Sequence, residues 1–172
     1  AGFRNLTLVD GTITVWDAVN QRQRRFGETD FDLVINAESR GLTATIATSG
    51  YAGRWSGTLE RTEDQRDGTH AMSGVFSQLT LADLFPGFGG SEGSASADIP
   101  LYGRANVGFD SDGAVASATL RLDVGAGVFS TGSEDESVLL DEATLKLDWD
   151  VANRIILVEP SPVFFGETRG IA

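Results

Sequence analysis

The stretch from Leu6 to Asp17 decides the fold class, and it reads Leu-Thr-Leu-Val-Asp-Gly-Thr-Ile-Thr-Val-Trp-Asp. Its apolar residues alternate with threonines on both sides of Asp10-Gly11. Such alternation puts apolar side chains on one face of a β-strand and polar ones on the other. Asp-Gly readily adopts a positive φ, so we expect a tight hairpin turn at this dipeptide. Because the segment from Phe31 to Ile35 repeats the alternation, the sequence predicts three consecutive strands of a one-faced antiparallel sheet.

The same kind of pattern recurs along the rest of the chain. Strand-like segments cover residues 41–61 (two strands broken near 49–53), 70–81, 102–109, 115–124, 145–151, 155–158 and 163–166. Short turns join many of them, the clearest being Asp110-Ser-Asp-Gly113. We therefore predict an all-β fold, mainly an antiparallel meander sheet that is curled or folded into a groove or a sandwich.

Three segments interrupt this pattern. Residues 79–85 could form at most one short helix, which Pro86-Gly87 would end. Residues 87–96 are rich in Gly and Ser, so we expect the most flexible stretch there, without a domain boundary. Residues 125–136 are expected to form a loose acidic connection.

Composition narrows the classes of function. The net charge is -12, and the phosphate backbone of nucleic acid attracts Lys and Arg, so we expect no nucleic-acid partner. The same charge disfavours electrostatic binding to anionic lipid headgroups, whereas neutral acyl chains stay compatible with it. The chain has no cysteine, which excludes disulfides, thiolate metal sites and cysteine nucleophiles.

Length and chain ends suggest how the domain is organised. We expect residues 1–172 to form a single β-rich domain or a fragment of a longer protein. The chain does not begin with Met, has no signal-peptide pattern and has no apolar run long enough to cross a bilayer. We interpret it as a fragment excised from a larger protein, which leaves room for a membrane anchor outside it.

Residues that could carry catalysis are sparse. His70 is the only histidine, and a Ser-His-Asp triad would need it as the base, with Ser73 or another serine and Asp67 or another acid. No nucleophile elbow accompanies these residues. One histidine and no cysteine also make a poor zinc site. We therefore expect no catalytic residues, no cofactor and no metal site.

Three further features each allow two interpretations. The acidic turn from Asp110 to Gly113 begins like a calcium loop, but the later ligand positions are wrong, which favours a simple turn. The basic segment 21–25 is expected to be solvated surface, with a phosphate or headgroup contact as the alternative. Trp16, Trp55 and Trp149 are expected to pack the sheet, with a sugar-binding platform as the alternative.

The chain resembles the AsmA-like family of bacterial envelope proteins, and in particular its large YhdP-type members with their domains of unknown function. The residues that carry the resemblance extend over much of the chain. They are Leu6–Asp17, Phe26 with Asp30–Leu33, Leu145–Asp150 and Pro162–Gly166.

This resemblance implies a long periplasmic β structure, tethered to the inner membrane by a segment outside the chain. It also implies an apolar groove that carries phospholipid or supports outer-membrane assembly, with envelope proteins as further partners. We expect a non-catalytic segment of such a groove. The apolar face is predicted to carry Leu33, Ile35, Ile46, Leu120, Leu122, Leu145 and Leu147.

Two questions stay open at this point. The alternating strands are also compatible with a closed β-sandwich, whose apolar face is its core and which binds carbohydrate or a protein partner. The sequence likewise leaves the oligomeric state, the lipid and the direction of transport undetermined.

Overall fold

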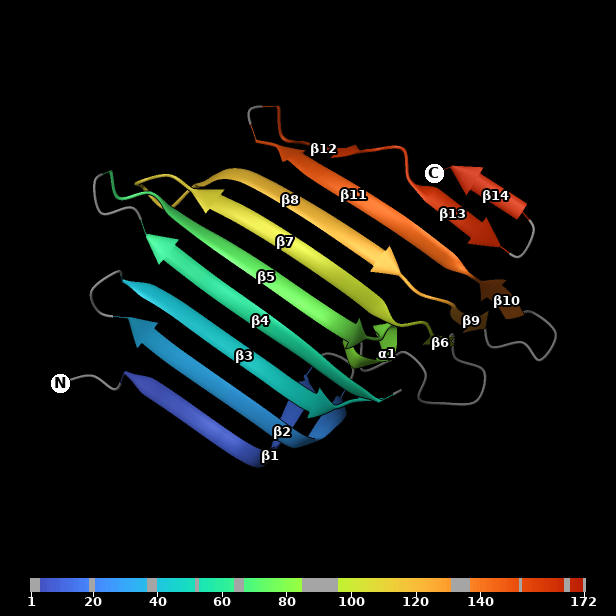
Figure 1. Cartoon of the computed structure of the whole chain (residues 1–172), viewed down its shortest axis with the longest axis horizontal. Coiled ribbons are helices and arrows are strands. Elements are labelled where there is room, and N and C mark those ends of the chain that lie inside the picture. Colours follow the sequence, from blue (N-terminus) through green and yellow to red (C-terminus); the bar gives the residue numbers. More distant parts are fainter. Residues whose placement is uncertain are drawn as a thin grey trace.

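The computed structural model is one large antiparallel sheet with a small sheet at one end (Figure 1). It describes residues 4–18, 21–36, 40–51, 53–63, 67–84, 96–130, 137–151, 153–165 and 168–171. The large sheet has the strand order β1-β2-β3-β4-β5-β7-β8-β11-β13-β14, with β12 also paired to β11, and the small sheet has the order β10-β9-β6. The predicted all-β fold with a meander topology is confirmed.

The elements have the following bounds. They are β1 (Asn5–Asp17), β2 (Arg22–Asn36), β3 (Gly41–Ser49), β4 (Arg54–Glu63), β5 (His70–Leu79), α1 (Leu81–Leu84), β6 (Ser96–Asp98), β7 (Leu101–Phe109), β8 (Val115–Val124), β9 (Gly127–Ser130), β10 (Ser137–Leu140), β11 (Glu142–Asp150), β12 (Ile155–Val158), β13 (Pro162–Phe165) and β14 (Thr168–Ile171).

Cross-strand register places the predicted apolar residues on one side of the large sheet, since residues directly opposite each other in antiparallel strands share a face. One row of opposed residues runs Phe31, Ile46, Gly57, Phe76, Gly103, Leu122, Leu145. The next row runs Leu33, Ala44, Leu59, Gly74, Ala105, Leu120, Leu147. We call the side that carries these two rows the apolar face. Ile35, opposite Leu42, lies on it as well, so all seven predicted residues share this face.

The hairpin predicted at Asp10-Gly11 is wrong. β1 runs through this dipeptide as one strand, and the register with β2 shifts there instead of reversing. Asp10 does adopt a positive φ of 49°, and Glu28 on β2 has a φ of 47° beside a second register shift. Positive φ at an extra residue is a property of bulges as well as of turns. The left-handed backbone was therefore predictable, but it bends the paired strands rather than ending them.

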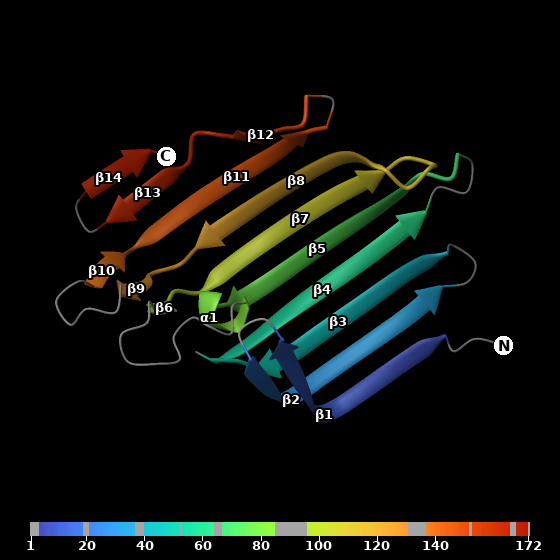
Figure 2. The ribbon, with the colours of Figure 1, turned by 180° about the vertical axis from the view of Figure 1, so that it is seen from behind.

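Bends and short elements gather at one end of the sheet. A further register shift on β5 accompanies a φ of 62° at Gln78, just before α1. The helix and the small sheet lie at the end where β3, β5 and β8 finish, as both views show (Figures 1 and 2). We call this part of the molecule the closed end. Its buried apolar residues are Phe26, Leu79, Ala82, Ile99 and Leu101.

The hydrophobic core is small and belongs to the closed end. Ile99 and Leu101 form its centre, and the half-buried side chains packed against them are Phe76, Leu81, Leu122, Val124, Phe129 and Leu140. Leu122 was predicted as part of the apolar face, and it is also a core residue. The apolar face is therefore continuous with the core at this end.

The interruptions of the strand pattern differ in part from the prediction. The helix covers only Leu81–Leu84, since Leu79 belongs to β5, and Phe85 lies outside the described residues. The connection expected to be loose at 125–136 contains the strand β9, whereas 131–136 lie outside the described residues. Of the segment 87–96, the structure describes only Ser96, at the start of β6.

Candidate functional site

The apolar face stays open over much of its area. Large apolar side chains on it are strongly exposed, including Leu6 at 52% and Leu59 at 39%. At the far side of the sheet Trp149 is 43% exposed and Ile156, opposite it on β12, is 66% exposed. Apolar side chains that are exposed on several strands of one face usually mark an interaction site. In the described part of the chain, the open apolar face is thus the leading candidate for function.

A shallow depression lies in the middle of this face. Its floor consists of small residues on three adjacent strands, namely Gly57, Gly74 and Ala105. Its volume is about 280 Å³. The larger apolar side chains around it are Phe31, Ile46, Leu59 and Phe76. Small residues surrounded by large ones leave room for an apolar group that lies flat on the backbone.

The depression was missed by sequence reasoning, although a signal for it was present. Gly57 and Gly74 both occupy positions where the alternation predicts a large apolar residue on the apolar face. A glycine in the interior of a strand weakens the strand and often marks a place where another group approaches the backbone closely. Two such glycines on neighbouring strands point to one shared hollow, once their register is known.

Phe76 separates the depression from the core. It stands directly opposite Gly103. A Cβ atom built on Gly103 would lie 2.2 Å from Cζ of Phe76, so the aromatic ring covers the glycine backbone. An aromatic side chain that covers a glycine on the next strand shields exposed backbone and fixes register. The absence of a side chain at Gly103 is therefore what lets Phe76 lie flat.

Aromatic side chains also mark the border between the apolar face and the closed end. Phe26 and Trp55 meet edge to face, with ring centroids 5.9 Å apart and an interplanar angle of 88°. The indole nitrogen of Trp55 is buried and has no hydrogen-bond partner among the residues that the structure describes. Trp55 lies two residues from Gly57 on β4, so it borders the row that contains the depression.

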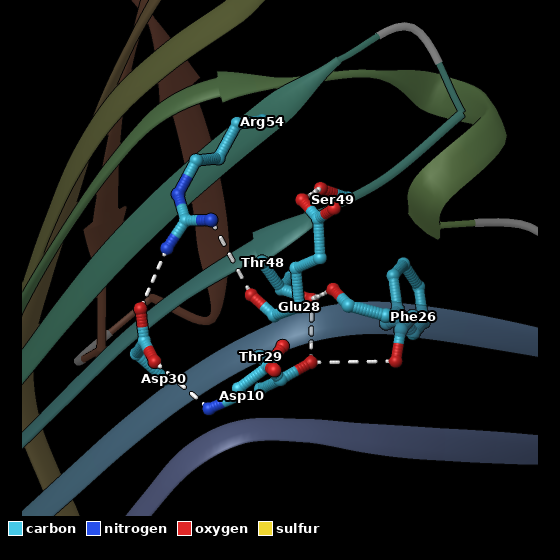
Figure 3. A network of polar contacts seen from close by, with 9 residues as sticks. Asp10, Phe26, Glu28, Thr29, Asp30, Thr48, Ser49 and Arg54 are labelled. Carbon is cyan, nitrogen blue, oxygen red and sulfur yellow. Dashed lines mark hydrogen bonds and ion pairs between the residues drawn. The ribbon is translucent and has the colours of Figure 1, made fainter.

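Polar contacts hold the bend of β1 and β2 in place (Figure 3). Thr29 and Thr48 are fully buried, and their hydroxyl oxygens are 2.6 Å apart. The hydroxyl of Thr48 also donates to the carbonyl of Gly27 at 2.9 Å. Buried hydroxyls that are paired in this way avoid the cost of desolvation. The two threonines therefore join β2 to β3 at the point where the register shifts.

An ion pair completes the bend on its exposed side. The guanidinium of Arg54 lies 2.7 Å from the carboxylate of Asp30, which also accepts the backbone N–H of Asp10 at 3.1 Å (Figure 3). The hydrogen bond from the Asp10 backbone, followed by that from Arg54, lowers the pKa of Asp30 below its ordinary value. The carboxylate thus links three strands at the bulges.

The basic segment has a structural role that was not expected. Arg24 donates a hydrogen bond to the carbonyl of Ala82 on α1, and its guanidinium lies 5.5 Å from the ring centroid of Tyr51. The expectation of solvated surface is therefore wrong for Arg24, because its side chain fastens the β1–β2 hairpin to the helix. Arg25 is exposed, as expected.

The opposite face of the sheet is polar. Arg104, Arg121 and Lys146 stand directly opposite one another on β7, β8 and β11. Acids accompany two of them: Arg121 lies 2.9 Å from Asp123, and Lys146 lies 3.1 Å from Glu159. Donation by Arg121 is the main reason that the pKa of Asp123 falls below its ordinary value. The acids offset the mutual repulsion of the cations along this row.

The residues considered for catalysis do not converge. His70 lies on the apolar face of β5, stacked on Phe109 with centroids 4.7 Å apart, whereas Ser73 points to the other face because the two differ by an odd number of positions. Asp67 accepts hydrogen bonds from the backbone and hydroxyl of Thr69 instead. The three residues considered for a triad therefore lie apart.

The acidic turn and the tryptophans can be placed as well. The carboxylate of Asp110 accepts the backbone N–H groups of Asp112 and Ala114, which makes this segment a turn as predicted.

Trp55 lies beside the closed end, while Trp149 is at the other end of β11, four strands away in the sheet. The structure therefore does not bring these two tryptophans together into one platform.

Other kinds of site have no counterpart among the described residues. No group of three or more His, Asp or Glu residues is arranged to hold a metal ion there. Within the same residues, no helix has the length and hydropathy needed to cross a membrane. In comparisons with known proteins, no family model, no curated protein and no solved structure matches this chain.

Proposed function

We propose that this chain is a non-catalytic segment of a hydrophobic groove, in which the apolar face of the large sheet holds the acyl chains of a lipid. The observation that carries the proposal is the apolar depression of about 280 Å³ in the open part of this face. Leaving a Leu or Phe side chain in water rather than burying it forfeits about 1.5–3 kcal/mol. A face with this many exposed apolar groups is therefore stabilised by a hydrophobic ligand that covers it.

The size of the depression suits part of one acyl chain. Pockets for small molecules have volumes of about 300–1,000 Å³ and are lined mainly by apolar groups with few polar ones. The depression, at about 280 Å³, lies just below this range, and it opens onto the apolar face rather than into the interior. An extended hydrocarbon could lie across the strands there, with its remainder on the exposed and half-buried leucines on either side.

The resemblance to AsmA-like proteins supplies the wider setting of the proposal. In that setting the chain is a periplasmic segment of a larger protein that is anchored in the inner membrane. The lipid is a phospholipid, and the task is lipid transport or support of outer-membrane assembly together with other envelope proteins. The all-β architecture with one open apolar face is compatible with this role.

The experiment that tests the proposal is organic extraction of the purified protein, followed by mass spectrometry of any lipid. The variant Gly74→Leu places an apolar side chain in the depression, and its Cβ atom would meet Leu59 and Thr58 at 3.8 Å, an ordinary van der Waals distance. Gly27→Leu is the matched control, because a Cβ atom at Gly27 would meet nothing within 4 Å and lies away from the depression.

We expect stoichiometric lipid with the unaltered protein and with Gly27→Leu, and several-fold less with Gly74→Leu. Lipid-free protein that also fails to take up phospholipid from vesicles would contradict the proposal. Equal amounts of lipid in the two variants would mean that the lipid does not bind in the depression. Leu122 is a poor position for this test, because its side chain packs against the core and a charge there would disturb folding.

A further inference from the structure

One edge of the large sheet is formed by β1, whose outer side has no partner strand in the described part of the chain. Its straight part, from Asn5 to Val9, contains no Lys, Arg or Pro, which are residues that commonly protect edge strands from pairing. Leu6, Leu8 and Val9 are exposed there, Val9 at 74%. Between Arg4 and the bulge at Asp10, this apolar edge is a template for another strand.

The hydrogen bonds of β1 show which backbone groups this edge offers. The backbone N–H of Ile35 donates to the carbonyl of Arg4 at 2.7 Å, so Arg4 directs its backbone groups toward β2. Residues of an edge strand alternate in this respect. Asn5, Thr7 and Val9 therefore direct their N–H and C=O groups outward.

These outward groups are self-complementary. If two copies of the edge run antiparallel with Thr7 opposite Thr7, then Asn5 of each copy stands opposite Val9 of the other. In each of these pairs both residues direct their backbone N–H and C=O groups outward, and each pair exchanges two hydrogen bonds. Leu6 then stands opposite Leu8, so the apolar faces of the two sheets join on the same side.

Charge selects this register among those that the alternation allows. With Thr7 on the axis, Arg4 of each copy stands opposite Asp10 of the other, which gives two ion pairs of opposite charge. A shift of the register by two residues in either direction places Arg4 or Asp10 opposite an apolar residue. The bulge at Asp10, with its φ of 49°, ends the straight edge just where the pairing would stop.

We propose that this edge is a dimerisation surface, at which two copies of the chain pair through Asn5–Val9 about a two-fold axis at Thr7. The two open apolar faces then form one surface of twice the length. A single strand pair is a small interface, so the dimer is weak and depends on concentration. Because each copy has a net charge of -12, the two copies repel each other, and added salt strengthens the dimer by screening this repulsion.

The first test uses the absence of cysteine in the chain. In Thr7→Cys the two new thiols stand opposite each other, with Cα atoms about 5.5 Å apart, which suits a disulfide. Val9→Cys is the matched control on the same edge, since its thiol stands opposite Asn5 and far from its equivalent. Under mild oxidation, we expect Thr7→Cys to form the covalent dimer roughly tenfold faster than Val9→Cys. Equal rates, or no dimer with Thr7→Cys, would overturn the proposal.

The second test is sedimentation equilibrium over a range of protein and salt concentrations. Thr7→Pro removes an outward N–H group and the hydrogen bond from the Thr7 hydroxyl to Asp32, but it leaves the backbone ladder to β2 intact, so we expect a folded monomer. Arg4→Glu should weaken the dimer, whereas Arg25→Glu, with the same change of charge away from the edge, should not. A monomer at every concentration of unaltered protein, or an open series of oligomers, would contradict pairing about a two-fold axis.

Discussion

Replacing Gly103 by alanine should destabilise the protein, whereas the same replacement at Gly74 should stabilise it. Both glycines lie on the apolar face in the interior of strands, and neither has a positive φ. They differ in what a Cβ atom would meet. At Gly103 it would lie 2.2 Å and 2.4 Å from two ring carbons of Phe76, while at Gly74 the nearest atoms are 3.8 Å away.

The expected magnitudes follow from these distances. In the interior of a strand, alanine is favoured over glycine by about 0.5–1 kcal/mol, and Gly74→Ala should gain this amount. Gly103→Ala gains the same amount but forces the ring of Phe76 out of its place, and such overpacking costs about 1–3 kcal/mol. The free energies of unfolding of the two variants should therefore differ by about 1–3 kcal/mol.

Urea denaturation followed by tryptophan fluorescence measures this difference, provided that the dependence on urea concentration is the same for both variants. In a Phe76→Ala background the ring is absent, and Gly103→Ala should then be as favourable as Gly74→Ala. Equal stability of the two alanine variants in the presence of Phe76 would refute the reasoning, since it would mean that the ring does not rest on Gly103.

Two other predictions concern the bend of β1 and β2. Thr48→Val keeps the shape of the side chain but leaves the carbonyl of Gly27 without its buried donor, so it should lower the free energy of unfolding in urea by about 1–3 kcal/mol. Because the hydroxyls of Thr48 and Thr29 are paired, Thr29→Val should cost less in the Thr48→Val variant than in the unaltered protein. The pKa of Asp30 is lowered by the folded structure, so its contribution to stability is present above its pKa in the unfolded chain and is lost as the pH falls through its folded pKa. In NMR titrations Arg54→Ala should raise the pKa of Asp30. The pKa of Asp67 should stay unchanged, because it is lowered mainly by hydrogen bonds from Thr69. An unchanged pKa of Asp30 in this variant would show that Arg54 does not act on it.

Alternation along the chain was enough to predict which residues share a face. The period of two holds for Leu33 and Ile35 as well as for Leu145 and Leu147, because each of these strands keeps the same apolar side along its length. Alternation alone could not place Leu33 beside Ala44, or Gly57 beside Phe76, since register depends on where each turn and bulge falls. The position of the depression therefore could not be predicted from the sequence, although its glycines interrupt the alternation visibly.

The error at Asp10-Gly11 has a physical cause. Residues that accept a positive φ occur both in hairpin turns and in bulges, and the dipeptide does not say which of the two forms. The outcome was decided by partners distant in sequence, since Asp30 on β2 accepts the backbone N–H of Asp10 and holds the bend. The same holds for Arg24, whose contact with Ala82 on α1 joins segments that no local pattern connects.

The strand order of the large sheet affects how the protein folds and how such a sheet can change in size. From β1 to β4 every strand pairs only with the strands before and after it in the chain. Each hairpin can thus close over a short loop, and stability accumulates from neighbour to neighbour, much as in repeat proteins. Loss of structure should accordingly begin at the outer strands, with the central strands the last to exchange their amide hydrogens. A hairpin inserted or deleted within this run would alter the width of the apolar face while leaving the remaining pairings in place.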